Sequence, residues 1–554
     1  MDTIRHYGRN SICGWIINAI AITAKNSVAA RMFGCGREAL NPIIQGSMLM
    51  QIMRINWGAQ GWLTTSYIAR GIARLGQAAN GLGLWAVESV ILVGRHSLVN
   101  RFLAWFRRAE EYGVRYGSKV LLGKAMGIVF PLALMILSQG SAWQYLGAAI
   151  AVYYIWRQPR CGLCLVLAGL AFLPTAISGR LILFTLAAAT VKRWRLGQPV
   201  NLTTGVEMPL LLFFGLVGIA VSTSVSRAGS ASVLPLYGLY VSAFYMAAIL
   251  PRREDVAGLL KGLLLAGLVA GLIGLVQYKS GIETSLSWID LEQAEDIKTR
   301  VFGPFDNPNI FAEYLTFVLP AALAFMITEA RLEMKAVWAG VLVVSGVALV
   351  ATFSRGGWLA SGASLLLLGL MWEPRLVLLM TAAIFVFPAL APDQVMSRAS
   401  SIGSLQDSSN VFRLSIWLAS LKMIATYCLS GIGPGTAAFN RIYPAFMIAG
   451  TPAIHTHNLF LQLALELGLP GLLAFLWLLL VVFSRSVAVL PALSYQDRGI
   501  LTAVVAALTG FLLHGAVDNV WYSPKMALLF WLILGLAVAM GKEADGSAGV
   551  ACDN

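Results

Sequence analysis

Long apolar runs separated by short polar segments dominate the chain from about residue 120 onward. A helix needs about 20 mostly apolar residues to cross the hydrocarbon core of a bilayer. Fourteen runs approach this length, and because several are short we expect twelve to fourteen membrane-spanning helices. The runs lie at about 120–138, 142–156, 161–175, 178–191, 207–225, 232–250, 256–277, 309–328, 336–353, 357–371, 376–390, 467–484, 500–517 and 526–541.

Two longer segments, at about 278–308 and 391–466, interrupt this pattern. Within the second, residues 411–430 predict an amphipathic helix lying on the membrane, with Trp417 as its interfacial anchor. Residues 456–467 predict another helix that leads into the next span. Because binding and catalytic residues concentrate in loops held by a rigid scaffold, we expect the function in this large loop.

The composition agrees with a membrane protein. Hydrophobic residues make up 58% of the 554 residues and charged residues only 12%, about half of the roughly 25% that is usual in soluble domains. So few charges could not cover the surface of a soluble protein of this size. A soluble enzyme, a disordered protein and a disulfide scaffold are excluded for the whole chain, and we predict an all-α, polytopic integral membrane protein.

The distribution of basic residues predicts the orientation. With a cytoplasmic N-terminus, the short inner loops hold 13 Lys and Arg and the short outer loops hold four, as the positive-inside rule requires. Both termini are then cytoplasmic and the long loop is extracytoplasmic. Residues 1–125 carry a balance of +10, from 15 basic and five acidic residues. Beside a membrane domain, this charge favours anionic lipid headgroups over nucleic acid as partner.

These patterns divide the chain into three parts. Residues 1–118 form a basic, amphipathic cytoplasmic extension, which is either a set of interfacial helices or a poorly ordered, non-catalytic segment. Residues 119–541 form the polytopic membrane domain, with the large outer loop at about 391–466. Residues 542–554 form a cytoplasmic tail.

Two histidines stand where the large loop returns to the membrane, in TPAIHTHNLFLQLALELGLPG. His455 and His457 are candidate bases, because imidazole is the side chain most readily poised near neutral pH. A single loop histidine is more often a hydrogen-bonded structural residue. The functional interpretation of the two histidines therefore depends on which other candidate residues the sequence offers.

Two arginines are further candidate residues that would act together with the histidine pair. Arg355, in TFSRGGWLA, lies at the outer end of a span, and Arg413, in SSNVFRLSIW, begins the predicted loop helix. A cation at a membrane interface is costly unless it is paired or functional, although each alone could snorkel to headgroups. Guanidinium groups match phosphate oxygens in bidentate geometry. Both arginines together with a histidine favour a polyanionic ligand such as a lipid pyrophosphate.

Other candidates carry weaker signals. GPFDNPNIFAEYLTFVLP has the signature of a helix start, and Asn309 in its first turn is a candidate substrate contact. His514 and Asp518, four positions apart in LHGAVDNVWYSPK, share a helix face at an outer end. The pair Cys161 and Cys164 is more consistent with packing than with a metal or redox site. The chain has no HExxH, GxSxG, Walker or DxD-like motif, so we expect neither a metal nor another cofactor.

Four motifs in this order resemble the O-antigen ligase and polymerase family. They are GPFDNPNIFAEYLTFVLP, TFSRGGWLA, RLSIWLASLKMI with LSGIGPGTAAF, and HTHNLFLQLALELGLPGLL. The resemblance covers about residues 200–541. It implies a glycosyltransferase in the bacterial cytoplasmic membrane that takes a glycan from undecaprenyl pyrophosphate. The implied acceptor is lipid A core for a ligase and a growing glycan for a polymerase.

The resemblance also implies residue roles. Arg355 and Arg413 match the arginines that hold the pyrophosphate, and His457 before Asn458 matches the family's histidine, a base or a pyrophosphate contact. HTHN offers His455 as a second histidine, and we place it with Asn458, Asn309, His514 and Asp518 as substrate-binding candidates. Direct attack by an acceptor hydroxyl, with His457 as base, predicts a metal-independent reaction that inverts the anomeric carbon.

Several alternatives remain open at this point. Ligase and polymerase use the same donor chemistry, and a protein O-glycosyltransferase would need only a Ser or Thr acceptor. A secondary transporter would have a similar number of spans, but the chain shows no internal repeat and its notable cations lie at outer ends. A non-catalytic scaffold would leave the Arg and His set unexplained.

Overall fold

The computed structural model describes residues 128–137, 142–198, 202–282, 299–403, 407–448 and 450–542. Within these ranges every regular element is a helix, which confirms the all-α prediction. The extension 1–118 and all of the tail after residue 542 lie outside the described residues. The described helices from Pro131 onward belong to one compact unit.

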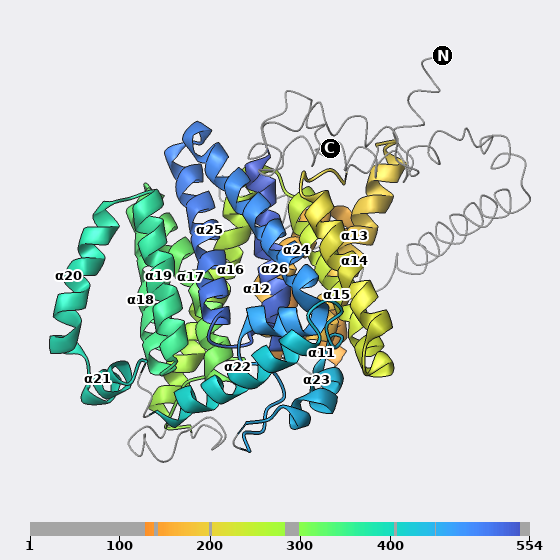
Figure 1. Cartoon of the computed structure of the whole chain (residues 1–554). Helices are drawn as coiled ribbons and strands as arrows, with labels where there is room; N and C mark the ends of the chain where they lie inside the picture. Colours follow the sequence, from red (N-terminus) through yellow and green to blue (C-terminus); the bar gives the residue numbers. More distant parts are fainter. Residues whose placement is uncertain are drawn as a thin grey trace, which may run out of the picture. The chain divides into compact units, whose positions relative to one another are not determined.

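The described helices follow the apolar runs of the sequence (Figure 1). Those of the bundle are α10 (Phe130–Leu137), α11 (Ala142–Arg157), α12 (Pro159–Gly169), α13 (Thr175–Arg195), α14 (Glu207–Thr223), α15 (Arg227–Ile249), α16 (Arg253–Lys279), α17 (Pro308–Thr328), α18 (Leu332–Ala351), α19 (Arg355–Met371), α20 (Arg375–Leu390), α24 (Leu459–Val489), α25 (Tyr495–Gly515) and α26 (Pro524–Gly541). Those of the large loop are α21 (Asp393–Ser400), α22 (Ser408–Thr426), α23 (Thr436–Ile442) and η3 (Tyr443–Ala445). The short turns η4 (Leu490–Ala492) and η5 (Val520–Tyr522) flank α25.

Eight of the described helices are long and apolar enough to cross a membrane, namely α13, α15, α16, α17, α18, α24, α25 and α26. The helices α12, α14 and α20 are apolar but shorter. The remaining predicted runs form α10, α11 and α19, each shorter than 18 residues. The chain is thus a polytopic membrane protein, with fewer full-length spans among its described residues than the twelve to fourteen that run length suggested.

The core of the bundle runs along α17, α25 and α26. Between 78% and 83% of the apolar window of each is buried, against 33% for α18. The helix α17 packs on α18, α19 and α25, while α26 packs on α15. The outer helices leave Leu, Val and Ile side chains exposed, as expected of helices that meet lipid.

The loops gather at two ends of the bundle, as the alternation of spans requires. At one end, Arg253 donates to the carbonyl of Met540 (3.1 Å) and Lys542 to that of Ala248 (2.9 Å). At the other end, Lys525 donates to the carbonyl of Ala171 (3.1 Å). The first end carries the loops predicted to be cytoplasmic, and the second carries the large loop.

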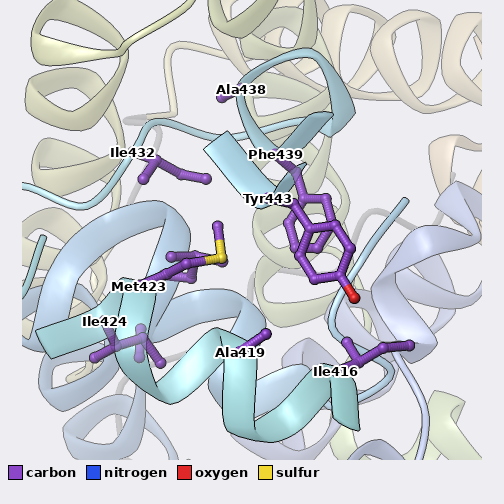
Figure 2. Packing of buried hydrophobic residues seen from close by; sticks show 10 residues of the cluster. Ile416, Ala419, Met423, Ile424, Ile432, Ala438, Phe439 and Tyr443 are labelled. Carbon is purple, nitrogen blue, oxygen red and sulfur yellow. The ribbon is translucent and has the colours of Figure 1, made fainter. Parts of the chain in front are cut away.

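The predicted loop helix is confirmed as α22, with bounds shifted to Ser408–Thr426, and it lies across the ends of the bundle helices (Figure 1). One face packs on α23 and η3, with Met423 of α22 in the same cluster as Phe439 and Tyr443 (Figure 2). The predicted amphipathic character is wrong, because the outward face carries the exposed side chains Leu414, Leu418 and Leu421. A helix that is apolar on both faces is suited to immersion in lipid rather than to a water-facing surface.

The last predicted loop helix is the first part of α24, which begins at Leu459 and is interrupted at Gly468. Gly468 has a φ of 72°, and the break frees carbonyl groups of the preceding turn. The glycine-rich loop satisfies them, since Ile432 donates to Leu465 (2.8 Å) and Gly433 to Glu466 (3.1 Å). This loop is therefore packed against a broken helix, which accounts for its glycines without an anion.

Candidate functional site

A carboxylate at the large-loop end of the bundle joins three distant segments of the chain. Asp518 follows α25, and its Oδ1 lies 3.1 Å from Nδ1 of His457. Its Oδ2 accepts a hydrogen bond from Nδ2 of Asn309 at 3.1 Å and lies 3.8 Å from Nη2 of Arg413. Four of the residues that the sequence singled out thus meet at one point.

Asp518 is ionised in this setting. Burial alone would raise the pKa of its carboxyl group, but the hydrogen bond from His457 and the positive charge of Arg413 outweigh burial and hold the pKa below its usual value. The backbone N–H of Asn519 also donates to Oδ1, at 2.8 Å. An ionised carboxylate only accepts hydrogen bonds, so Nδ1 of His457 carries the proton and Nε2 of the neutral imidazole is left with its lone pair.

The backbone around His457 is held in an uncommon conformation. Its φ is 51°, in the left-handed region that costs a residue other than glycine about 1–3 kcal/mol. Thr456 Oγ1 donates to the carbonyl of Asn458 at 2.7 Å, and the indole N–H of Trp417 donates to the carbonyl of His457 at 3.3 Å. Trp417 therefore contacts the site rather than serving only as the predicted membrane anchor.

Asn458 has a structural role in this arrangement. Its side-chain oxygen caps α24 by accepting from the backbone N–H groups of Phe460 and Leu461, at 2.9 and 3.0 Å. Its amide nitrogen donates to the carbonyl of Ala516 at 2.7 Å. These bonds tie the start of α24 to the end of α25, and they bring His457 beside Asp518.

The second histidine differs from the first. The ring centroid of His455 lies 4.1 Å from that of His457 and 4.7 Å from that of Tyr522. Burial, together with the neighbouring His457, lowers the pKa of His455 from 6.5 to about 4, so its ring is neutral at physiological pH. Its Nδ1 accepts from the backbone N–H of His457 at 3.2 Å. Of the two rings, His457 is the one bonded to a carboxylate.

Arg355 is engaged by a carboxylate that is distant in the sequence. Its Nη1 and Nη2 lie 2.6 and 2.8 Å from the two oxygens of Asp407, and Nη1 also donates to Ser401 Oγ at 2.8 Å. Asp407 caps α22 by accepting from Asn410 N at 3.1 Å. In this structure the guanidinium fork that was predicted to contact the pyrophosphate is paired with Asp407. Through this pair Arg355 holds the start of α22, the helix that presents Arg413.

Arg300 belongs to the site, although the sequence analysis missed it. It is 8% exposed, and it donates through Nε to the carbonyl of Thr352 (2.9 Å) and through Nη2 to Oδ1 of Asn309 (3.1 Å). Burial and the charges of Arg398, Arg413 and Arg355 lower its pKa to about 9. Its position three residues before the first glycine of the GPFDNPN motif was the available signal.

The guanidinium groups of Arg300, Arg355, Arg398 and Arg413 thus lie close enough to repel one another. Ion pairs join the last three of them to two carboxylates. Arg355 and Arg398 contact Asp407, the latter at 3.7 Å, and Arg413 contacts Asp518. An anion bound here would relieve this repulsion. Arg413 forms no close hydrogen bond to Asp518, at 3.8 Å, and its side chain is 21% exposed.

His514 is buried next to Asp518, near the end of α25. It is 2% exposed, and a Cβ added at Gly356 would lie 2.9 Å from its Cδ2. Its backbone carbonyl accepts from Asp518 N at 3.0 Å. The structure therefore places His514 against the start of α19 and next to Asp518 rather than on an open surface, and its predicted contact with the substrate stays a prediction.

Chemically, the arrangement offers a base next to a cationic cluster. His457 Nε2 can accept a proton, Asp518 stabilises the resulting imidazolium, and Arg413 offers hydrogen-bond donors to an anion. In the described part of the chain, no group of three or more His, Cys, Asp or Glu residues is arranged to hold a metal ion.

Comparison with known proteins gives one family match, which covers part of the chain. Residues 339–476 match the family model described as O-antigen ligase. This segment contains Arg355, Arg413 and His457, whereas Asn309 and Asp518 lie outside it. No curated protein matches the chain. Because the match falls on motifs that carried the resemblance, it supports the O-antigen ligase and polymerase family for this polytopic membrane protein.

Proposed function

We propose that this protein is a membrane glycosyltransferase of the O-antigen ligase type. It transfers a glycan from undecaprenyl pyrophosphate to an acceptor hydroxyl at the outer face of the cytoplasmic membrane, with both termini in the cytoplasm. The observation that carries this proposal is the pair His457 and Asp518 beside the guanidinium group of Arg413.

The cationic cluster is suited to the donor's leaving group. A sugar linked to pyrophosphate already has a good leaving group, so the enzyme must mainly bind the departing phosphates and stabilise the negative charge that develops on them. Arg413 and Arg300 are the residues we assign to this task. Arg355 acts as a positioning residue, because its ion pair with Asp407 fixes the start of α22.

The histidine is suited to the acceptor. Nε2 of His457 removes the proton from the acceptor hydroxyl as the hydroxyl oxygen forms a bond to the anomeric carbon. The bond from that carbon to the pyrophosphate oxygen breaks, and its electron pair leaves with the lipid pyrophosphate. The proton stays on His457, whose charge Asp518 stabilises. A single displacement of this kind inverts the anomeric carbon and involves no metal ion.

The location of the charges favours an enzyme over a secondary transporter. The arginines and His457 gather at one end of the bundle, where α17, α19 and α24 begin and α25 ends. A transporter site is expected near the middle of the spans, between broken helices. A polymerase of the same family remains the second candidate, since it would use the same site with a growing glycan as acceptor.

Glycan analysis of a deletion strain tests the proposal. Long glycan stranded on undecaprenyl pyrophosphate is the result expected for a ligase, whereas single repeat units on the carrier would indicate a polymerase. An unchanged profile would reject both. Complementation with Arg413→Ala should fail, while Arg375→Ala should restore the profile, because Arg375 is 89% exposed at the opposite end of the bundle.

A further inference from the structure

A cavity of about 220 Å³ lies next to the histidine pair, between α15, the first part of α24 and the segment from Asn519 to Pro524. His455 forms part of its wall and Trp521 another part. Small-molecule sites usually measure about 300–1,000 Å³, so this cavity is suited to a single ring rather than to a chain of sugars. The function proposed above makes no use of it.

Among the described residues, two that line the cavity each carry a buried polar atom with no hydrogen-bond partner. These atoms are the side-chain oxygen of Asn519, an acceptor, and the indole N–H of Trp521, a donor. Asn519 is 8% exposed. Buried polar groups are nearly always hydrogen-bonded, so an unpaired donor and an unpaired acceptor in one cavity indicate a ligand that offers both, as a hydroxyl group does.

The remaining walls combine aromatic faces with a fixed carboxylate. Tyr240 and Trp521 stack with their ring centroids 6.3 Å apart. Glu466 accepts from Gln462 Nε2 at 2.8 Å and from Gly435 N at 3.0 Å, so its orientation is set before any ligand arrives. Flat aromatic surfaces pack against the C–H faces of a ring, while a few placed polar groups set its orientation.

The residues that line the cavity disfavour a phosphate group and a polyprenyl chain as its occupant. Among the described residues that line the cavity there is no Lys or Arg, whereas Glu466 is one of them, and this disfavours a phosphate group. A polyprenyl chain would leave Asn519 and Trp521 without partners and would bury them against hydrocarbon. A neutral ring bearing hydroxyl groups satisfies both requirements.

We propose that this cavity binds one neutral sugar ring of the acceptor. The order of contacts favours the acceptor sugar over the donor sugar as the occupant of the cavity. Arg413 lies beside Asp518, which is hydrogen-bonded to His457. On the other side, His457 contacts His455, and His455 lines the cavity. The base thus stands between the proposed pyrophosphate site and the cavity. Trp521 and Asn519 are specificity-determining residues, and this assignment builds on the proposed glycosyl transfer.

Binding of simple sugars tests the cavity independently of catalysis. Full-length protein in detergent is titrated with a panel of methyl glycopyranosides, and binding is followed by saturation-transfer NMR. At least one glycoside should bind, and Trp521→Phe should weaken it about fivefold through loss of one hydrogen bond. Trp143→Phe is the matched control, because Trp143 is 60% exposed and away from the cavity. Binding by none of the panel, or equal binding by Trp521→Phe, would overturn the assignment.

Transfer kinetics separate this inference from the proposed function. With undecaprenyl-pyrophosphate-linked glycan as donor, Trp521→Phe and Asn519→Ala should raise the KM for the acceptor about fivefold and leave the KM for the donor unchanged. Unchanged acceptor KM in both variants would reject the cavity as the acceptor site while leaving the transferase intact. Absence of transfer by the wild type would reject the proposed function, and with it the assignment of the ring to an acceptor, even if methyl glycosides bind.

Discussion

Nδ1 of His457 lies 3.1 Å from Oδ1 of Asp518, a residue 61 positions later in the chain. The first residue ends the large loop and the second follows α25, so the contact joins the loop to the last two helices of the bundle. The contact also determines which nitrogen of the His457 ring is available to accept a proton. Nε2 is the available base only as long as Asp518 accepts from Nδ1.

Replacement of the base removes proton transfer while the fold is retained. His457→Gln should lower the rate of glycan transfer about 10²–10⁴-fold, the usual contribution of a general base. Asp518→Asn should lower it as well, because an amide stabilises no imidazolium and does not hold the same tautomer. Initial rates in isolated membranes measure both effects. Full activity of His457→Gln would remove this residue from the mechanism.

The two arginines that the motifs single out should behave differently. Arg355→Ala leaves the carboxylate of Asp407, which is 1% exposed, with weakened pairing, and breaking a buried pair costs about 3–5 kcal/mol. We expect a marked fall in thermal stability. Arg355→Lys should rescue it only in part, because lysine cannot match the bidentate geometry. Thermal unfolding in detergent measures these changes.

Arg413→Ala should instead leave thermal stability near that of the wild type. Its side chain is 21% exposed, and it lies 3.8 Å from Asp518 without a close hydrogen bond. Transfer should fall about 10²–10³-fold through loss of charge stabilisation on the leaving group. Equal destabilisation by Arg355→Ala and Arg413→Ala would contradict the separate roles.

The stability of the protein should depend on pH through His455. Its pKa is lowered from 6.5 to about 4 by burial, so the unfolded state binds the proton more readily. The stabilisation is complete above pH 6.5 and is lost as the pH falls towards 4, by about 3 kcal/mol at most. The melting temperature of His455→Gln should be less sensitive across this window. Identical pH dependence of variant and wild type would show that His455 is not the titrating group.

The glycine-rich loop offers a matched test of packing. A Cβ at Gly431 would lie 2.3 Å from the carbonyl oxygen of Glu466, at a φ of 65°. Gly403 has a φ of 76° but nothing within 4 Å of such a Cβ. Gly403→Ala therefore adds backbone strain alone, whereas Gly431→Ala also separates the loop from α24. The second variant should melt at a clearly lower temperature, and similar melting of the two would argue against tight docking of the loop.

The sequence predicted the helices better than their contacts. Apolar runs locate most spans, and the helix start predicted in GPFDNPN is the start of α17, which Asn307 caps. The outward face of α22 was misjudged, because Leu418 and Leu421 meet the surroundings rather than the core. Helix periodicity reports which residues are apolar but does not report what covers them.

Four of the candidate residues lie together in the structure, but the sequence did not predict which residues pair with one another. Asp407 lies 52 positions from Arg355, and Asp518 lies 209 positions from Asn309. No local pattern encodes such contacts, since they arise only when helices pack. Arg300 was missed for the same reason, because its role depends on reaching Asn309 and the neighbouring arginines.

The most direct measurement is the anomeric configuration of the product made by purified protein. Undecaprenyl-pyrophosphate-linked glycan of known configuration is incubated with an acceptor in the presence of a chelator, with wild type and His457→Gln in parallel. The wild type should form product with inverted configuration and release undecaprenyl pyrophosphate, while His457→Gln should form little product. Product of retained configuration, or equal product from the two proteins, would contradict direct attack assisted by His457.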